Sequence, residues 1–212
     1  MQQIKAQHIS SGSGYEVGQS LLFDGSSALS SGLTSSSTYT VSLWVKRSRL
    51  SSSQYLVGNF GLEFKADDHI ALGGSSGTAV YRDVSSWYHI VLSPGTTGKV
   101  YVNGVEDNGG FGFTSTLDPS LIGSQFDGYM AEVHYIDGQA LGPEHFALTD
   151  SNGVYNPIPY TGTYGANGFY LPFEASDIGA DKSGNGNDFT PSGLTSDSVV
   201  ADTPSNNYCT LN

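Results

Sequence analysis

The stretch YTVSLWVK, residues 39–46, decides the fold class of this chain. Its odd-numbered positions are apolar or aromatic, and its even-numbered positions are polar apart from Trp44. Successive side chains of a β-strand point to opposite faces, so this period of two predicts a strand with one face in a core. The core face would carry Tyr39, Val41, Leu43 and Val45, and the other face would carry Thr40, Ser42, Trp44 and Lys46.

Similar strand signals recur on both sides of this stretch. Residues 87–92 alternate in the same way, and residues 99–103 lead into Asn103-Gly104, a dipeptide typical of a tight hairpin turn. Many short strands at regular spacing predict an all-β, two-sheet antiparallel jelly-roll sandwich. A short helix is expected near residues 142–148, because Pro143 suits a first helical position. The other expected strands cover residues 20–23, 54–60, 62–66, 69–72 and 126–136.

The composition excludes an all-helical protein and disfavours a nucleic-acid partner. The chain has 212 residues, of which 28 are glycine and only 13% are charged, so strong helix formers are scarce. Twenty acidic and eight basic residues give a net charge of −12, which repels a phosphate backbone. The basic run Lys46-Arg47-Ser48-Arg49 is expected on a solvated strand end, and the Asp24-Gly25 and Asp67-Asp68 pairs are expected in plain turns.

The cysteine count and the hydropathy of the sequence predict which covalent links and membrane segments the chain lacks. Cys209 is the lone cysteine, so neither an internal disulfide nor a cysteine-based zinc cluster is expected. The first thirty residues lack a basic start followed by an apolar core, which predicts no signal peptide. No apolar run approaches membrane-spanning length, so no membrane insertion is expected.

Four strings carry a resemblance to a known family. They are SLLFDGSSAL (20–29), YTVSLWVKRS (39–48), SSWYHIVLSPGTTGKVYVNGV (85–105) and FDGYMAEVHYIDGQALGPEHF (126–146). In order and spacing they resemble the laminin-G-like, concanavalin A-type jelly roll over residues 20–148. This fold hosts lectins, adhesion modules, enzymes and structural proteins, so the resemblance implies a fold rather than an activity.

The rest of the chain flanks this predicted domain. Residues 1–19 are expected to form an N-terminal arm or linker, and residues 149–212 an aromatic, Gly/Asn-rich C-terminal extension. The string GFYLPFEASDIGADKSGNGNDFT (168–190) resembles the segment that normally opens such a domain. Two alternatives follow: the segment folds back to complete the same sandwich, or it begins a further module.

The ending DTPSNNYCTLN (202–212) resembles multi-module virion proteins of phages. The resemblance implies a non-enzymatic structural or adhesion protein on the virion surface, made in the host cytoplasm. Such a protein would be a fibre, an appendage or a capsid-decoration module. Its expected partners are other virion proteins, further copies of the chain in a homo-oligomer, and a cell-surface glycan.

Aromatic side chains suggest where a glycan would bind. Trp44, His89 and Tyr101 face away from the predicted core, and outward aromatic rings can stack on sugars. The alternative is that the aromatic segment 155–173 covers this face, because large exposed apolar patches are uncommon. Rim loops offer a second set of contacts, which comprises Tyr81, Arg82, Asp83 and Asn108.

The loop DKSGNGND, residues 181–188, resembles the first half of a calcium-binding loop. Asp181, Ser183 and Asn185 supply oxygen atoms at alternate positions, and Asn187 or Asp188 could complete the shell. The position of the usual bidentate glutamate is Ser192, so the second half of the pattern fails. The alternative is a turn built from Asx and glycine residues; apart from calcium, no cofactor is expected.

An enzyme on the same fold is the other functional hypothesis. Hydrolysis of glycosidic bonds needs a pair of carboxylates on one face, and the chain has no E-x-D-x-E string. Glu132 and His134 alternate on one strand, with Asp137 on the other face, which would suit a lyase. Since such isolated pairs are mostly incidental, the sequence predicts a non-enzyme, with a polysaccharide hydrolase or lyase as the alternative.

Overall fold

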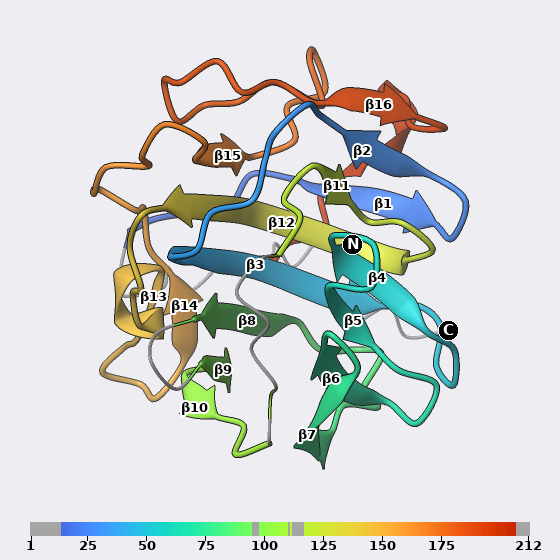
Figure 1. Cartoon of the computed structure of the whole chain (residues 1–212), viewed down its shortest axis with the longest axis vertical. Helices are drawn as coiled ribbons and strands as arrows, with labels where there is room; N and C mark the ends of the chain where they lie inside the picture. The colour runs from blue at the N-terminus through green and yellow to red at the C-terminus, as the bar shows by residue number, and fades with distance from the viewer. Residues whose placement is uncertain (1–13, 95–97, 110, 112–116, 207–212) are drawn as a thin grey trace, which may run out of the picture.

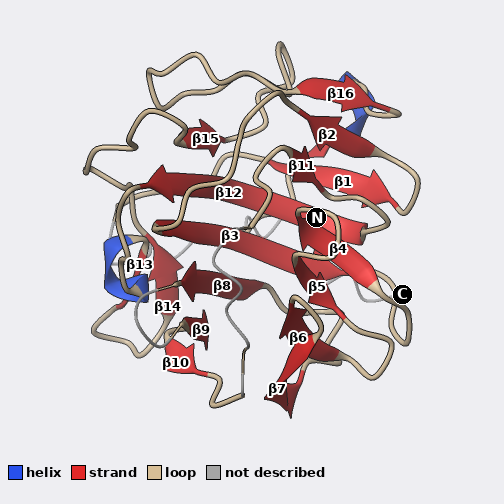
Figure 2. Cartoon of the chain, in the orientation of Figure 1, coloured by secondary structure: helices blue, strands red, loops and turns tan. Residues whose placement is uncertain are grey.

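The structure, a computed structural model, describes residues 14–94, 98–109, 111 and 117–206. Within these residues the chain forms two antiparallel sheets stacked as a sandwich (Figures 1 and 2), which confirms the predicted all-β fold class. The helical turns of the described residues are two 3-10 helices, η1 (Pro143–His145) and η2 (Ser196–Ser198), and η1 lies where a short helix was expected. In the described ranges no helix is long and apolar enough to cross a membrane.

The larger sheet, sheet A, contains the predicted alternating strands at its centre. Its strand order is β10-β9-β8-β3-β12-β1-β17, and β15 also pairs with β12. The register places Leu43 beside Ile90 and Val45 beside Met130, so apolar residues of neighbouring strands face the same side. Its strands are β1 (Ser20–Asp24), β3 (Tyr39–Arg47), β8 (Tyr88–Ser93), β9 (Lys99–Val102), β10 (Val105–Glu106), β12 (Asp127–Asp137), β15 (Phe169–Leu171) and β17 (Val199–Val200).

The second sheet, sheet B, lies across the inner face of sheet A. Its strand order is β16-β2-β11-β4-β5-β6-β7. A two-stranded ribbon, β13 (Ala147–Thr149) with β14 (Tyr155–Pro157), stands apart from both sheets. The strands of sheet B are β2 (Ala28–Ser30), β4 (Gln54–Val57), β5 (Leu62–Phe64), β6 (His69–Leu72), β7 (Ser75–Val80), β11 (Leu121–Ile122) and β16 (Thr190–Ser192).

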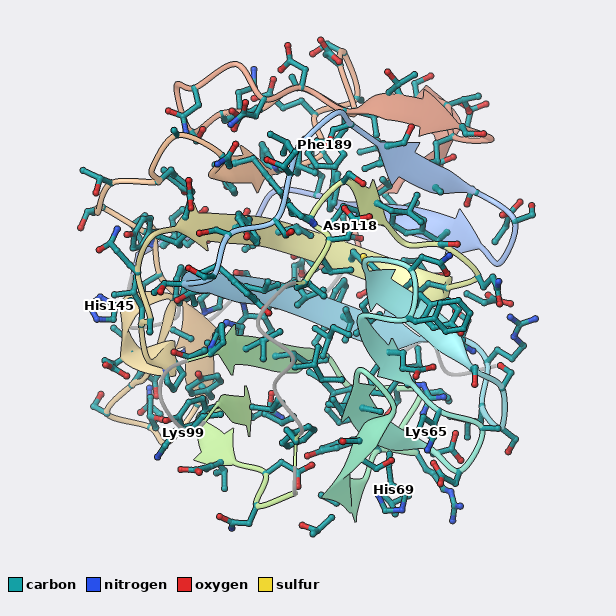
Figure 3. The ribbon with its side chains drawn as sticks, in the orientation of Figure 1. Lys65, His69, Lys99, Asp118, His145 and Phe189 are labelled. Atoms are coloured by element: carbon teal, nitrogen blue, oxygen red, sulfur yellow. The ribbon has the colours of Figure 1, made fainter. Side chains whose placement is uncertain are left out.

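The core lies between the sheets and is built from the predicted alternation. The apolar residues expected on the core faces of β3 and β8 all belong to one buried cluster. Phe189 from the C-terminal segment, labelled in Figure 3, joins that cluster. It packs edge-on against Phe169, with 4.7 Å between ring centroids. Burial of these side chains is the main favourable contribution to folding. The cluster includes Tyr39, Val41, Leu43, Val45, Tyr88, Ile90 and Leu92.

The C-terminal extension is part of both sheets. β15 pairs with β12 and β17 pairs with β1 in sheet A, while β16 pairs with β2 in sheet B. The alternative in which residues 168–190 return to the same sandwich therefore describes the structure. Residues 14–19 also contact the sandwich, since Val17 is buried and its N–H donates to the Ser205 hydroxyl. Residues 1–13 of the expected arm, Cys209 and the rest of 207–212 lie outside the described residues.

Candidate functional site

The outer face of sheet A, where Trp44 and His89 lie, is covered by the C-terminal segment. Trp44 is 4% exposed and His89 is fully buried. The two rings stack with 4.7 Å between centroids, and Tyr155 packs against both. Neither side chain offers a surface to a sugar ring, so their expected role in binding is corrected: the covering alternative describes this face.

Both ring nitrogens of His89 have polar partners, one in sheet A and one in the cover. Its Nε2 contacts the Ser42 hydroxyl at 2.8 Å, and its Nδ1 contacts the Tyr155 hydroxyl at 2.9 Å. Burial, with a smaller contribution from nearby His134, lowers the pKa of His89 to about 3, so the ring is neutral near pH 7. Although Ser42 and His89 resemble a nucleophile and its base, both are buried, and their contact joins the neighbouring strands β3 and β8 of sheet A.

Glu132 and His134 lie farther along the same covered face. Glu132 has a left-handed backbone, with φ of 51°, at a bulge where the register between β12 and β3 shifts. Its carboxylate accepts hydrogen bonds from the hydroxyls of Tyr15 at 2.6 Å and Tyr170 at 2.8 Å. His134 stacks on Tyr170 and contacts the Tyr164 hydroxyl at 2.9 Å.

The surroundings of Glu132 favour its ionised form. Burial alone would raise the pKa of Glu132, but His134 and the two tyrosine hydroxyls outweigh it and lower that pKa. The Glu132 side chain is 7% exposed and that of His134 is 4% exposed. This pair is therefore enclosed by tyrosines from the N-terminal and C-terminal parts of the chain, and little of it reaches solvent. Asp137, at the end of β12, accepts hydrogen bonds from Asn167.

Arg47 is buried, which corrects the expectation of a solvated basic run at the end of β3. Its side chain is 0% exposed and pairs with Asp68 at 3.0 Å across the sandwich. Its guanidinium also donates to the Tyr81 carbonyl at 2.6 Å and lies 4.3 Å from the centroid of the Phe64 ring. Asp68 accepts further hydrogen bonds from the Ser51 N–H and from Arg82 Nε, both at 2.9 Å. Asp68 therefore lies in a turn, as expected, and forms ion pairs with both Arg47 and Arg82.

The predicted rim residues do not form one group. Arg82 is exposed but is held by Asp68. Asp83 is exposed and accepts hydrogen bonds from Ser85 and Ser86, which lower its pKa to about 2. Tyr101 is half-buried at the edge of an apolar cluster on the covered face.

Tyr81 and Asn108 do come together, in a hollow of about 380 Å³ between β7 and the β9–β10 hairpin. The Tyr81 hydroxyl donates to the Asp107 carboxylate at 3.0 Å, and the Tyr81 ring packs edge-on against Tyr88. The other Asp107 oxygen accepts hydrogen bonds from the N–H and hydroxyl of Thr78. These contacts fix the Tyr81 ring in the wall of the hollow, whereas Asn108 is exposed at its rim.

The hollow contains polar residues that the sequence reasoning missed. Asn103 and Glu106 also line it, and both belong to the hairpin predicted from Asn103-Gly104. Their place beside Asn108 in the sequence was a usable signal, because hairpin ends and loops commonly carry binding residues. The approach of Asp107 to Thr78, 29 residues away, had no such signal.

The loop 181–188 is held by internal hydrogen bonds. The Asp181 carboxylate accepts from the N–H groups of Tyr170, Ser183 and Asn187 and from the Ser183 hydroxyl. The side-chain amide of Asn185 donates to the carbonyls of Gly165 and Gly168. The Asn187 amide likewise donates to two backbone carbonyls, and Asp188 accepts from the Asp181 N–H. Among the described residues, no group of three or more His, Cys, Asp or Glu side chains is placed to hold a metal.

A family model agrees with the architecture. A laminin-G-type model of the concanavalin A-like lectin/glucanases superfamily matches residues 23–146. Domain 4 of AbnA, a GH43 extracellular arabinanase from Geobacillus stearothermophilus solved with arabinotriose, is 25% identical with a TM-score of 0.45. That match covers 58% of this chain and 72% of the other.

A native heptameric SAP-like pentraxin from Limulus polyphemus is 14% identical with a TM-score of 0.44. The match covers 60% of this chain and 79% of the pentraxin chain. The comparison with curated proteins found no match.

Proposed function

Because the chain belongs to the concanavalin A-like lectin/glucanase superfamily, we propose that it is a non-enzymatic carbohydrate-binding module that uses the hollow beside Tyr81. The single observation that carries the proposal is the meeting of Tyr81 and Asn108, from separate segments, in one open hollow. Trp44 and His89 are covered, so binding at the hollow needs no movement of the aromatic cover.

The lining of the hollow suits a sugar. The Tyr81 ring, fixed by Asp107 and Tyr88, offers an apolar surface that need not be ordered on binding. Asn103, Glu106 and Asn108 offer amide and carboxylate groups that can exchange hydrogen bonds with sugar hydroxyls. This combination of one rigid ring and several polar groups is typical of small-ligand sites.

Charge narrows the class of sugar to neutral glycans. Glu106 and Asp107 line the hollow, while no lysine, arginine or histidine does so among the described residues. Lys99, the nearest cation in the hairpin, is paired with Glu106 at 2.8 Å. The net charge of −12 adds a long-range repulsion toward sulfated or uronic-acid polymers.

The test is binding to an array of neutral and acidic glycans, followed by calorimetry on the neutral ones that bind. We expect Asn108→Ala to weaken binding about tenfold, the equivalent of one good hydrogen bond. The matched control is Asn59→Ala, because Asn59 is also exposed but lies in the β4–β5 turn, outside the hollow. Equal affinity of wild type and Asn108→Ala, or a preference for acidic glycans, would argue against this site.

A reducing-sugar assay on algal and bacterial glycans tests the non-enzymatic part of the proposal. The enclosure of Glu132 by Tyr15 and Tyr170 supports an absence of turnover. Turnover that disappears in Glu132→Gln would overturn it.

We further propose that the module is displayed on a phage particle, as a fibre, an appendage or a capsid-decoration protein. The resemblance of its sequence to phage virion proteins supports this context. Display would require other virion proteins as partners, and a homo-oligomer would multiply weak glycan contacts. Labelling of assembled particles with an antibody against the chain, viewed by electron microscopy, tests the location.

A further inference from the structure

A second hollow lies on the other side of the β9–β10 hairpin. It has a volume of about 530 Å³ and is bounded by the hairpin, by η1 and β13, and by Tyr155. Asn103 and Val105 line both hollows, so the hairpin is their shared wall. In Figure 1 this hairpin lies beside the β13–β14 ribbon, away from the covered centre of sheet A.

Tyr155 provides the second hollow with a fixed ring. Its hydroxyl is bonded to buried His89, and its ring packs against Trp44 with 5.9 Å between centroids. Gly104 allows the hairpin to approach this ring: it has φ of 79°, and a Cβ there would lie 3.1 Å from the ring. Tyr155 therefore holds the position in this hollow that Tyr81 holds in the first.

The second hollow also has polar groups in its lining, and Asn103 is common to both hollows. Asn103 is held by the His89 N–H, which donates to its side-chain oxygen at 2.8 Å, so its NH₂ group keeps donors for a ligand. Glu144, whose side chain is 73% exposed, and exposed Thr149 supply further polar groups. Among the described residues, no cation lines this hollow. Lys99 and His145 both lie at the left of Figure 3, but neither belongs to the lining.

The shared wall carries an exposed apolar side chain, Val105, beside Asn103. Val105, at the start of β10, is 71% exposed, and Leu148 across the second hollow is 37% exposed. A chain of sugar rings can lie over Val105 with its apolar ring faces while its hydroxyl groups reach the polar groups on either side. An isolated sugar in one hollow would leave the Val105 side chain exposed to solvent.

We infer that the second hollow is a second saccharide subsite, and that the ligand is an extended neutral oligosaccharide crossing the hairpin over Val105. This inference rests on the proposed function, because it assumes that the first hollow binds a sugar. Linking two subsites through one ligand raises affinity without any new type of contact.

The experiment is calorimetry with ladders of gluco-, manno- and xylo-oligosaccharides of one to six units. For wild type we expect the affinity to rise at least about tenfold from one unit to four in a ladder that binds. Glu144→Ala and Leu148→Asp, both at exposed positions, should each remove most of this gain. The matched control is Glu174→Ala, which changes a surface glutamate that lines neither hollow and should keep the gain.

The outcomes separate the two claims. Binding that does not depend on chain length, or a gain that persists in both Glu144→Ala and Leu148→Asp, would overturn the second subsite while leaving the first intact. If none of the ladders and no glycan of the array binds, the proposed function fails and this inference fails with it.

Discussion

The hydroxyl of Tyr155 lies 2.9 Å from Nδ1 of His89, and this contact joins the C-terminal segment to the centre of sheet A. The two residues are 66 positions apart in the sequence. Because His89 also contacts Ser42 and stacks on Trp44, one tyrosine closes a network that spans β3, β8 and β14. The same tyrosine lines the second hollow, so the cover and the candidate site share a residue.

Replacing Tyr155 by phenylalanine should destabilise the fold. The variant keeps the ring but leaves the buried Nδ1 of His89 without its hydroxyl partner, which costs about 1–3 kcal/mol of unfolding free energy. Urea denaturation followed by tryptophan fluorescence measures this loss. Tyr129→Phe is the matched control, because Tyr129 is half-buried in the same cluster but does not contact His89. An unfolding free energy equal to that of wild type would show that the hydrogen bond contributes nothing.

His89 should make stability depend on pH between the pKa values of its folded and unfolded forms. An unfolded histidine has a pKa of about 6.5. Burial lowers the pKa of folded His89 to about 3, so between these values the unfolded chain binds a proton that the folded chain does not. The unfolding free energy therefore falls as the pH falls, by about 1.5 kcal/mol between pH 6.5 and 5.0.

His89→Gln should flatten this pH profile, whatever its effect on absolute stability. Urea denaturation at a series of pH values between 5 and 7 gives the slope. His145→Gln is the control and should keep it, because the His145 side chain is 47% exposed. A slope that survives in His89→Gln would assign the proton uptake to another group.

Strands with a clear alternating pattern could be predicted from the sequence. Very short strands and contacts between residues far apart in the chain could not. The period of two in β3 and β8 was sufficient to place Leu43 and Ile90 in the core. By contrast, β17 has only two residues, and so short a strand shows no alternation to recognise. The burial of Arg47 depends on Asp68, which lies in a turn 21 residues away. No pattern near Arg47 in the sequence identifies Asp68 as its partner.

The candidate site was predicted in part for the same reason. Tyr81 and Asn108 were named from their expected positions on rim loops, and the structure brings both to one hollow. Trp44 and His89 were named from their outward direction, which is right, but direction does not reveal a cover. The competing signal was the density of aromatic residues in 155–173, which are the residues that need a surface to pack on.

Replacing Asp68 by asparagine should cost more than any change to its exposed partner. Arg47 would keep its positive charge in a site where its side chain is 0% exposed, and breaking such a buried pair costs about 3–5 kcal/mol. Arg82→Gln is the matched control: it removes the other cation on the same carboxylate, but the Arg82 side chain is 64% exposed. Its loss should be below about 1 kcal/mol. Equal losses in the two variants, measured by urea denaturation, would contradict this ranking.

The 181–188 loop gives a prediction that separates a hydrogen-bonded turn from a calcium site. The Asp181 carboxylate accepts four hydrogen bonds, three of them from backbone N–H groups. Asp181→Asn would turn an NH₂ group toward some of these donors, with an expected loss of about 2 kcal/mol. Asp188→Asn is the control, because Asp188 accepts a single backbone bond through an oxygen that the amide retains.

Calcium would have to displace these donors to reach the Asp181 oxygens, so the thermal unfolding midpoint should be the same in millimolar calcium chloride and in EDTA. A midpoint that rises with calcium in wild type and not in Asp181→Asn would instead establish a metal site in this loop.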